Sequence, residues 1–435
     1  MSRRVLVAGC GAAGMMAAIA AARGGAAVTV LEGMEKPGKK LLLTGNGRCN
    51  LTNLDPKLPE KYRTSAENGS LNEILQQFSV ADTLDFFHSL GLLTTEKNGY
   101  VYPYTGQAGS VLELLLAEMR RLKVKVKLSE KIRKIEKQEE GAADRWVVQT
   151  ETWSYRCDCL ILCCGSRAME TTGSDGSGYV LAKQAGHTVA PVLPALTALT
   201  TEKRKFLAAC GGVRCPAKVM LFDGPDGEQK FYLQEEALNG RSERKPLAED
   251  TGELQFTENG ISGIVVFQVS RYAALALHSG KKVFAVLDFL PEIPPGELER
   301  LIDQTVKRYE QTDVSVSSAF AGLLPKKLLT ALLDHLKLRP GSAAAGLTQK
   351  QKLQFVQMIK GFPLPVTGSR PFSQSQVCAG GIPLSEIDPV TLESRKASGL
   401  YFAGEILDVD GPCGGYNLQW AWSSGFTAGH HAAGF

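Results

Sequence analysis

Apolar and polar positions follow two different patterns along the chain, and the change lies near residue 190. Before it, short apolar runs alternate with longer segments whose apolar residues recur at helical spacing. The expected strands are 4–9, 27–31, 123–128, 146–150 and 158–163, and the expected helices are 12–24, 71–90 and 108–121. This alternation favours a mostly parallel sheet with helices on its faces.

The second pattern predicts an insert at 191–361. Residues 191–295 show short β-type runs with turn signals, such as 218–222 and 230–233, and the pair Asn259-Gly260 is a strong hairpin signal. Residues 296–361 carry leucines at helical spacing, and strand and glycine segments resume at 362. We therefore expect one α/β domain built from 1–190 and 362–435, interrupted by a β-rich part (191–295) and a helical part (296–361).

The first strand leads into a Gly-x-Gly-x-x-Gly turn at 9–14, an alanine-rich helix, a second strand and Glu32. This order is that of a Rossmann-like βαβ unit, which holds the ADP half of FAD or NAD. Gly9 permits the tight turn, Gly11 lets a pyrophosphate approach the backbone, and Gly14 allows the helix to pack closely. The helix N-terminus attracts phosphate, and the carboxylate of Glu32 can accept from ribose hydroxyls. A βαβ unit without a ligand and a secretory leader are the alternatives, but glycines interrupt the apolar run and a strand follows it.

A second motif near the C-terminus distinguishes FAD from NAD. An apolar strand ends in Gly404-Glu405, where a carboxylate can accept from a ribityl or ribose hydroxyl. Residues 414–417 then open a helix whose free N–H groups would point at flavin N1/O2, which gains negative charge on reduction. An ADP-type N-terminus combined with this C-terminus favours FAD.

Three further segments carry polar chemistry. The loop 44–50 combines glycines with Arg48, a suitable phosphate ligand, although a plain surface loop is the alternative. Cys49 has no second cysteine nearby, which disfavours dithiol chemistry. The segment 173–178 could be a second nucleotide loop, but a helix start capped by Asp175 or Ser177 is favoured. The tyrosines at 100–104 could supply a phenol, but strand packing is favoured.

Composition excludes several classes of protein. The net charge is +4 over 435 residues, with 44% hydrophobic and 22% charged residues, which fits a soluble protein without a nucleic-acid partner. No apolar run is long enough to span a membrane. The ten cysteines form no C-x-x-C pair and the six histidines show no metal spacing, so we expect a cytoplasmic protein with buried thiols and no metal.

The motifs at 44–53, 380–384, 386–394 and 401–419 resemble the bacterial flavoproteins grouped with aminoacetone oxidase and the bile-acid-inducible flavin oxidoreductase BaiN. The resemblance covers essentially the whole chain and implies an FAD-binding Rossmann-like domain whose insert has a β-barrel part and a helical part. It implies pyrophosphate contacts from Gly9, Gly11, Ala13 and Gly14, a ribose contact from Glu32, and cofactor-lining positions at Lys40, Thr44, Gly45, Arg48, Cys49 and Asn50. It further implies Ile132 against adenine, Gly165 beside the ribose, and Glu405, Asp408, Gly415, Asn417, Leu418 and Gln419 around the ribityl and isoalloxazine groups.

These features predict an FAD-dependent oxidoreductase that transfers hydride at flavin N5 to or from a small organic substrate, held between the FAD domain and the insert. An O2-using amine or aminoketone oxidase and an NAD(P)H-linked ene-reductase both fit, and NAD(P)H would dock transiently because there is one convincing nucleotide motif. A flavin-bearing RNA-modifying or regulatory protein is a further alternative, for which the basic segment 123–137 could be cited; we interpret that segment as strand and solvated face. The sequence identifies no catalytic residue, substrate or oligomeric state.

Overall fold

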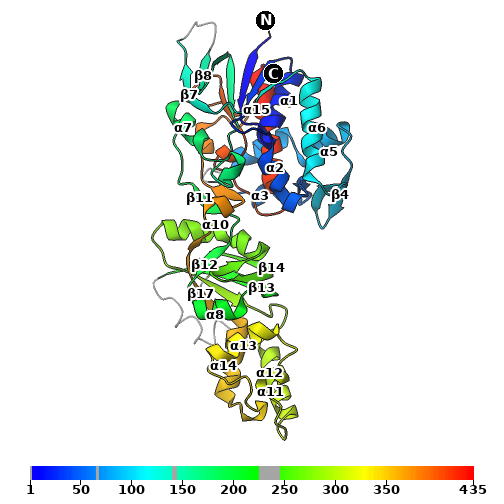
Figure 1. Ribbon diagram of the computed structural model, residues 1–435, viewed down its shortest axis with the longest axis vertical. Helices are drawn as coiled ribbons and strands as arrows, with labels where there is room; N and C mark the ends of the chain where they lie inside the picture. Colours follow the sequence, from blue (N-terminus) through cyan, green and yellow to red (C-terminus); the bar gives the residue numbers. More distant parts are fainter. Residues whose placement is uncertain (1, 65–67, 140–144, 225–244) are drawn as a thin grey trace. The chain divides into compact units, whose positions relative to one another are not determined.

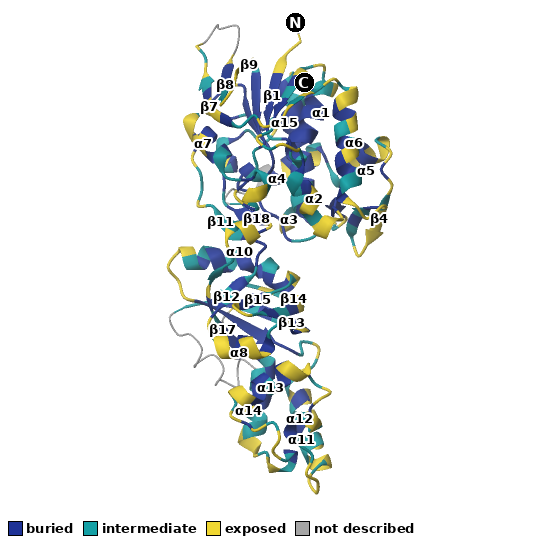
Figure 2. Ribbon diagram, viewed as in Figure 1, coloured by how far each residue is buried: buried dark blue, intermediate teal, exposed yellow. Residues whose placement is uncertain are grey.

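The computed structural model describes all residues except 1, 65–67, 140–144 and 225–244 (Figure 1). The chain divides into two compact units, Met1–Leu193 with Phe372–Phe435, and Pro194–Pro371. Each unit has its own buried hydrophobic core (Figure 2).

A five-stranded parallel sheet organises the first unit. Its strand order is β19-β10-β1-β2-β6, with bounds Leu400–Phe402, Cys159–Leu162, Arg4–Ala8, Ala27–Leu31 and Lys125–Lys127. The central strand β1 is buried from Val5 to Ala8, because a parallel sheet covered on both faces needs continuous apolar runs. The helices of this unit are α1 (Ala12–Arg23), α2 (Lys39–Leu43), α3 (Leu58–Lys61), α4 (Asn68–Gln77), α5 (Val80–Ser89), α6 (Ala108–Arg121), α7 (Ser177–Gln184) and α15 (Tyr416–Ala433).

Two predictions for this unit differ from the structure. The strand expected at 146–150 is β8 (Trp146–Thr150), but it lies in an antiparallel sheet with β7 (Ile132–Lys137) and β9 (Ser154–Cys157) rather than in the parallel one. The helix expected at 71–90 is broken, because Ser79 starts a new helix through a capping box with Asp82. A third small sheet contains β3 (Thr52–Asn53), β5 (Tyr100–Pro103) and β4 (Thr94–Lys97).

The first and last helices of the chain pack directly on each other (Figure 1). A Cβ atom on Gly425 would lie 2.5 Å from the carbonyl oxygen of Ala13, and one on Gly429 would lie 2.2 Å from that of Ala17. Because both glycines lack a side chain, the backbones of α15 and α1 can approach closely. This contact holds α15 along α1, with Gly425 beside the first turn of α1.

The second unit contains a closed antiparallel barrel. Its strand order is β12-β15-β14-β13-β16-β17, with bounds Leu199–Thr201, Gly260–Ser262, Ala248–Thr257, Arg214–Asp223, Val283–Asp288 and Phe362–Ser369. The predicted strand at 218–222 lies in β13, whereas 230–233 falls outside the described residues. The predicted hairpin at Asn259 joins β14 to β15. Gly260 is the first residue of β15 and packs against β12, since a Cβ on Gly260 would lie 1.9 Å from Leu199 O.

The helices of this unit lie between the barrel strands in sequence. After β12 comes α8 (Arg204–Cys210), after β15 comes α10 (Ile264–His278), and between β16 and β17 come α11 (Pro295–Arg308), α12 (Val316–Ala319), α13 (Lys326–His335) and α14 (Gln349–Lys360). The strand β17 closes the barrel by pairing with β12 and β16, and this compact unit extends to Pro371. The predicted α/β fold, with an insert that has a barrel part and a helical part, is confirmed. Within the described ranges, no helix is long and apolar enough to cross a membrane.

Candidate cofactor-binding site

The glycine turn after β1 has the geometry of a phosphate cradle. Gly9 has φ +100° and its N–H donates to Leu31 O at 2.8 Å, which holds the turn against β2. A Cβ on Gly14 would lie 2.0 Å from Gly9 O, so only glycine allows this close approach of α1. A Cβ on Gly11 would meet nothing within 4 Å, so open space lies before the uncapped N-terminus of α1. The residues present therefore fit a pyrophosphate at this position.

Glu32 connects the turn to the end of β2. Its carboxylate accepts from the backbone N–H groups of Cys10 (2.7 Å) and Met34 (2.9 Å). Burial raises the pKa of Glu32 above its usual value, and these two hydrogen bonds act in the opposite direction. Each carboxylate oxygen keeps a further lone pair, so the group can hold the turn and still accept from a ribose hydroxyl.

A polar cluster lies at the carboxyl ends of β10 and β19. Lys40 Nζ lies 2.5 Å from Glu405 Oε2, and Ser166 Oγ donates to the same oxygen at 3.1 Å. Gly404 has φ +77° and its carbonyl accepts from Trp420 Nε1 at 3.1 Å, which ties this turn to α15. Oε1 of Glu405 receives no hydrogen bond from the described residues and is available for a ribityl hydroxyl.

The N-terminus of α15 offers free donors beside this cluster. Gly415 has φ +94°, and a Cβ there would lie 2.5 Å from Thr52 O. The first intrahelical bond runs from Gln419 N to Gly415 O, so the N–H groups of Tyr416, Asn417 and Leu418 have no intrahelical acceptor. Such a helix end stabilises negative charge, which is what a reduced flavin develops.

Two residues implied as cofactor ligands have side chains engaged within the protein. Asn417 accepts from Gly411 N and donates to Gly411 O, both at 2.8 Å, and so holds the preceding loop. Gln419 is 1% exposed; it accepts from Thr52 Oγ1 at 2.6 Å and donates to Thr83 Oγ1 at 2.9 Å. The side chain of Gln419 therefore anchors α15 to β3 and α5.

The loop 44–50 carries a run of left-handed residues. Gly45, Asn46 and Gly47 have φ between +56° and +82°, within the 3-10 turn Thr44–Gly47. Thr44 donates its hydroxyl to Leu41 O at 2.6 Å, and Arg48 is exposed. Cys49 is fully buried, and burial raises the pKa of its thiol to about 12, which keeps it protonated at neutral pH.

Individual contacts describe the remaining predicted positions. Asn50 is buried, and a Cβ on Gly415 would lie 2.9 Å from its side-chain amide. Asp408 is 2% exposed and its N–H donates to Ile382 O at 2.9 Å. Ile132 begins β7, and the residue two before it, Glu130, donates its N–H to Glu32 O at 2.9 Å. Gly165 follows β10 with φ +73°, and a Cβ on Gly404 would lie 2.8 Å from the Cβ of Ala13.

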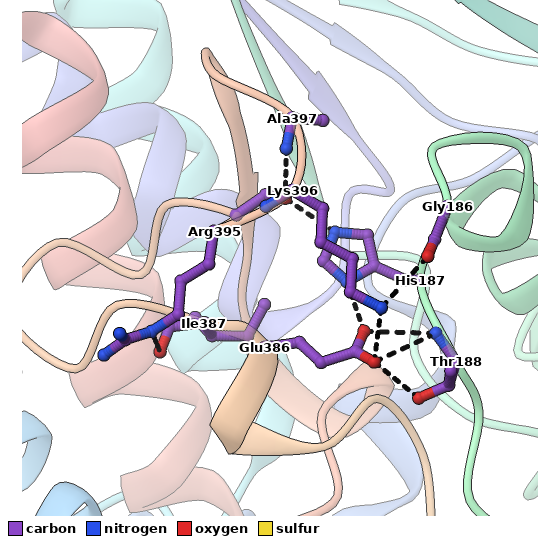
Figure 3. Close-up of polar contacts among 9 residues, drawn as sticks. Gly186, His187, Thr188, Glu386, Ile387, Arg395, Lys396 and Ala397 are labelled. Atoms are coloured by element: carbon purple, nitrogen blue, oxygen red, sulfur yellow. Dashed lines mark hydrogen bonds and ion pairs between the residues drawn. The ribbon is translucent and has the colours of Figure 1, made fainter.

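Sequence reasoning missed a buried polar cluster around His187 (Figure 3). His187 Nδ1 lies 2.8 Å from Glu386 Oε2, and Nε2 lies 2.7 Å from Ser394 Oγ. This order of serine, histidine and acid is that of a hydrolase triad. However, Ser394 Oγ also accepts from the backbone N–H groups of Lys396 (3.0 Å) and Ala397 (2.8 Å), which occupy its lone pairs. A nucleophile needs a free lone pair, so the cluster is structural: it joins the segment after α7 to the segment before β19.

A parallel sheet with a glycine cradle after β1, an acid after β2 and a helix start beside β19 defines a Rossmann-type flavoprotein. The chain belongs to the family described as HI0933-like protein Rossmann domain, whose model matches residues 3–431. The predicted family is thereby confirmed.

Named relatives match nearly the whole chain. The 3-dehydro-bile acid delta(4,6)-reductase of Clostridium scindens is 42% identical over 436 residues, 99% of either chain. Ribosomal RNA dihydrouridine synthases of Haemophilus influenzae and Escherichia coli are 29% and 28% identical and cover 97% of this chain and 96% of their own. A solved 3-ketosteroid-delta4-(5alpha)-dehydrogenase of Rhodococcus jostii is similar at 16% identity and a TM-score of 0.47, covering 100% of this chain and 97% of its own. On the sequence matches, the chain is a flavin-dependent oxidoreductase.

Proposed function

We propose that this chain is an FAD-dependent reductase that saturates a carbon–carbon double bond conjugated to a carbonyl group. We further propose a small apolar substrate of the steroid type and NADH or NADPH as the electron donor. The observation that carries this proposal is the 42% identity, over 99% of both chains, to a reductase named for a 3-dehydro-bile acid.

The names of the more distant relatives support reduction over oxidation. Dihydrouridine is uridine with the double bond beside its ring carbonyl reduced, so a dihydrouridine synthase and a delta(4,6)-reductase make the same kind of bond change. An O2-using amine or aminoketone oxidase would form a double bond instead. The shared bond change therefore favours the ene-reductase among the predicted reactions.

Each part of the site would have a defined task. When bound, FAD supplies a flavin that exchanges hydride at N5. The turn at Gly9–Gly14 and the N-terminus of α1 would bind the pyrophosphate, and Glu32 the adenosine ribose. Lys40 and Ser166 would orient Glu405 toward a ribityl hydroxyl, and the first turn of α15 would stabilise negative charge.

Anaerobic spectroscopy tests this proposal. NADH or NADPH should bleach the visible absorption of the FAD-loaded protein, and a 3-oxo-4,6-diene steroid should restore the colour while gaining hydrogen, as seen by mass spectrometry. Bleaching by an amine or aminoketone, with O2 restoring the colour, would show an oxidase. A colourless protein that takes up no FAD would contradict the whole assignment.

An RNA substrate is the second candidate, favoured by the two dihydrouridine synthases. The basic segment 123–137 gives it little support, because Lys131, Arg133 and Lys134 pair with Asp175, Glu151 and Glu136. Lys125 and Lys127 lie on the edge strand β6, where lysines protect a sheet from further pairing. Dihydrouridine that appears in ribosomal RNA only when this protein is expressed would decide for the RNA substrate.

A further inference from the structure

Tyr100, a residue for which the sequence favours strand packing, lies against the loop that leads into α15. A Cβ on Gly414 would lie 2.2 Å from Tyr100 Cε1 and 3.3 Å from Tyr100 Cζ, the carbon that carries the hydroxyl. Asn53 pairs with Tyr100 between β3 and β5, and its Nδ2 donates to Gly414 O at 2.8 Å. The phenol of Tyr100 is therefore held beside the glycines that precede the first turn of α15, where we propose that the flavin binds.

Two other tyrosines at this loop have engaged hydroxyls. Tyr62 is 4% exposed, and its hydroxyl donates to Tyr416 O at 2.6 Å. Tyr416 is 7% exposed, and its hydroxyl donates to Asp55 Oδ2 at 3.0 Å. Tyr100 is half-buried, so it keeps surface that a substrate can contact.

The carboxylic acids of the same loop are less accessible than Tyr100. Asp408 and Asp410 are each 2% exposed. Cys413 is half-buried, which makes its thiol the alternative acid at this loop. The test below therefore includes a variant of Cys413.

Reduction of an enone needs a proton donor as well as a hydride donor. When the hydride, with its two electrons, bonds to the β-carbon, the carbon–carbon π bond breaks and leaves an enolate. The α-carbon must then accept a proton as the carbonyl group re-forms. A phenol suits this step, because it is protonated at neutral pH and a positioned tyrosine can act as a general acid.

We propose that Tyr100 is the catalytic acid of the reductase, and that its hydroxyl gives a proton to the α-carbon of the substrate. The O–H bond of Tyr100 breaks, a C–H bond forms at the α-carbon, and the phenolate regains a proton from water. NADH or NADPH supplies the two electrons that reach the β-carbon as hydride. This inference rests on the proposed function, because it requires an enone substrate.

Tyr100→Phe tests the inference, with Tyr104→Phe as the matched control. Phenylalanine keeps the ring that packs on Gly414, and Tyr104 is 72% exposed. Anaerobic stopped-flow spectroscopy on the FAD-loaded chain follows bleaching by NADH or NADPH, and then reoxidation by a 3-oxo-4,6-diene steroid. General acid catalysis contributes roughly 10²–10⁴-fold to a rate. We expect Tyr100→Phe to slow reoxidation by such a factor and to leave bleaching unchanged, while Tyr104→Phe changes neither.

Two further readouts distinguish a catalytic tyrosine from a structural one. The affinity of the apoprotein for FAD and its thermal midpoint should be the same in Tyr100→Phe and wild type, because neither measurement involves the substrate. Tyr100→fluorotyrosine places a stronger acid of similar shape at this position. This variant should reoxidise readily and lose activity at a lower alkaline pH than wild type, because a general acid must be protonated. It also keeps the test open should Tyr100→Phe fold poorly.

The outcomes separate the two proposals. Reoxidation at the wild-type rate in Tyr100→Phe overturns the role of Tyr100 and leaves the reductase standing, and so does a loss of reoxidation in Cys413→Ser alone. Equal slowing of bleaching and reoxidation, or weaker FAD binding, would make Tyr100 structural and also overturn its role as an acid. A wild-type protein that no enone reoxidises overturns the proposed function itself.

Discussion

Lys40 Nζ lies 2.5 Å from Glu405 Oε2, which joins α2 to the end of β19 across 365 residues of sequence. Their side chains are 23% and 19% exposed, so the pair is largely shielded from water. Charge-assisted hydrogen bonds of this kind fix geometry as well as adding stability. The orientation of Glu405 therefore depends on a residue near the other end of the chain.

Replacing Lys40 with methionine should weaken FAD binding. The change leaves Glu405 with Ser166 as its hydrogen-bond donor, and losing a shielded charged hydrogen bond costs about 1–2 kcal/mol, or roughly tenfold in Kd. Titration of apoprotein with FAD measures this. Lys36→Met removes an exposed lysine a few residues earlier and should leave the affinity unchanged. Equal FAD affinity in the two variants would show that FAD binding does not depend on the pairing of Lys40 with Glu405.

The contact between α1 and α15 should tolerate no side chain at Gly429. Its Cβ would lie 2.2 Å from the carbonyl oxygen of Ala17, a backbone atom that can move only with α1. Gly429→Ala should therefore lower the free energy of unfolding by about 1–3 kcal/mol through overpacking. Because the same contact positions the start of α15, flavin content after purification should also fall.

Gly109 provides the control for that substitution. It lies in the first turn of α6, where a Cβ would meet nothing within 4 Å. Gly109→Ala should leave stability unchanged or raise it slightly, because alanine favours helix more than glycine does. Chemical denaturation compares the two variants, and similar losses in both would rule out the packing argument.

The His187 cluster predicts a loss of stability in acid. Burial lowers the pKa of His187 below its ordinary 6.5. The unfolded state then binds more protons than the folded state as the pH falls below 6.5, so the free energy of unfolding decreases. Burial raises the pKa of Glu386, but hydrogen bonds from Lys396 and Thr188 outweigh burial and lower this pKa from 4.5 to about 2. The protein should therefore lose further stability as the pH falls from 4.5 to about 2.

Urea unfolding over a pH series measures both effects. Glu386→Gln should be less stable than wild type at neutral pH and should lose less stability between pH 4.5 and about 2. His278→Gln removes an exposed imidazole in the barrel unit and should follow the wild-type curve. Parallel curves for wild type and Glu386→Gln would show that the carboxylate of Glu386 is not the group responsible.

Local patterns predicted the fold well, and long-range contacts account for what they missed. The parallel strands β1, β10 and β19 were predictable because each is a largely apolar run, and the turn at Gly9–Gly14 was predictable because its glycines have fixed spacing. The helix break at Ser79 could have been predicted from the capping box of Ser79 and Asp82, but this signal is weaker than the apolar periodicity around it. The sheet to which β8 belongs could not be predicted, because an apolar run is compatible with either a parallel or an antiparallel neighbouring strand.

The predicted site residues divide in the same way. The roles of Gly9, Gly11 and Gly14 follow from local geometry, whereas the pairing of Lys40 with Glu405 depends on how distant strands meet. Residue type alone did not predict the contacts of Gln419. Its side-chain amide could bind a flavin, but it hydrogen-bonds to Thr52 and Thr83.

The barrel unit should depend strongly on one buried lysine. Lys360 Nζ lies 2.7 Å from Asp288 Oδ2 and donates to the carbonyl oxygens of Leu290 (2.7 Å) and Ile293 (2.8 Å), and its side chain is 6% exposed. Burial raises the pKa of Asp288, and Lys360 acts in the opposite direction. Lys360→Met removes this partner and should cost about 3–5 kcal/mol, measured by chemical denaturation.

Two variants separate loss of the charge pair from loss of the side chain. Asp288→Asn combined with Lys360→Met removes both charges and should recover part of the stability, because an unpaired buried carboxylate is the main cost. Lys352, at the start of α14, pairs with Asp303, which is 42% exposed, so Lys352→Met should cost under about 1 kcal/mol. A double variant no more stable than Lys360→Met would instead assign the cost to the carbonyl oxygens of Leu290 and Ile293, which lose the same donor.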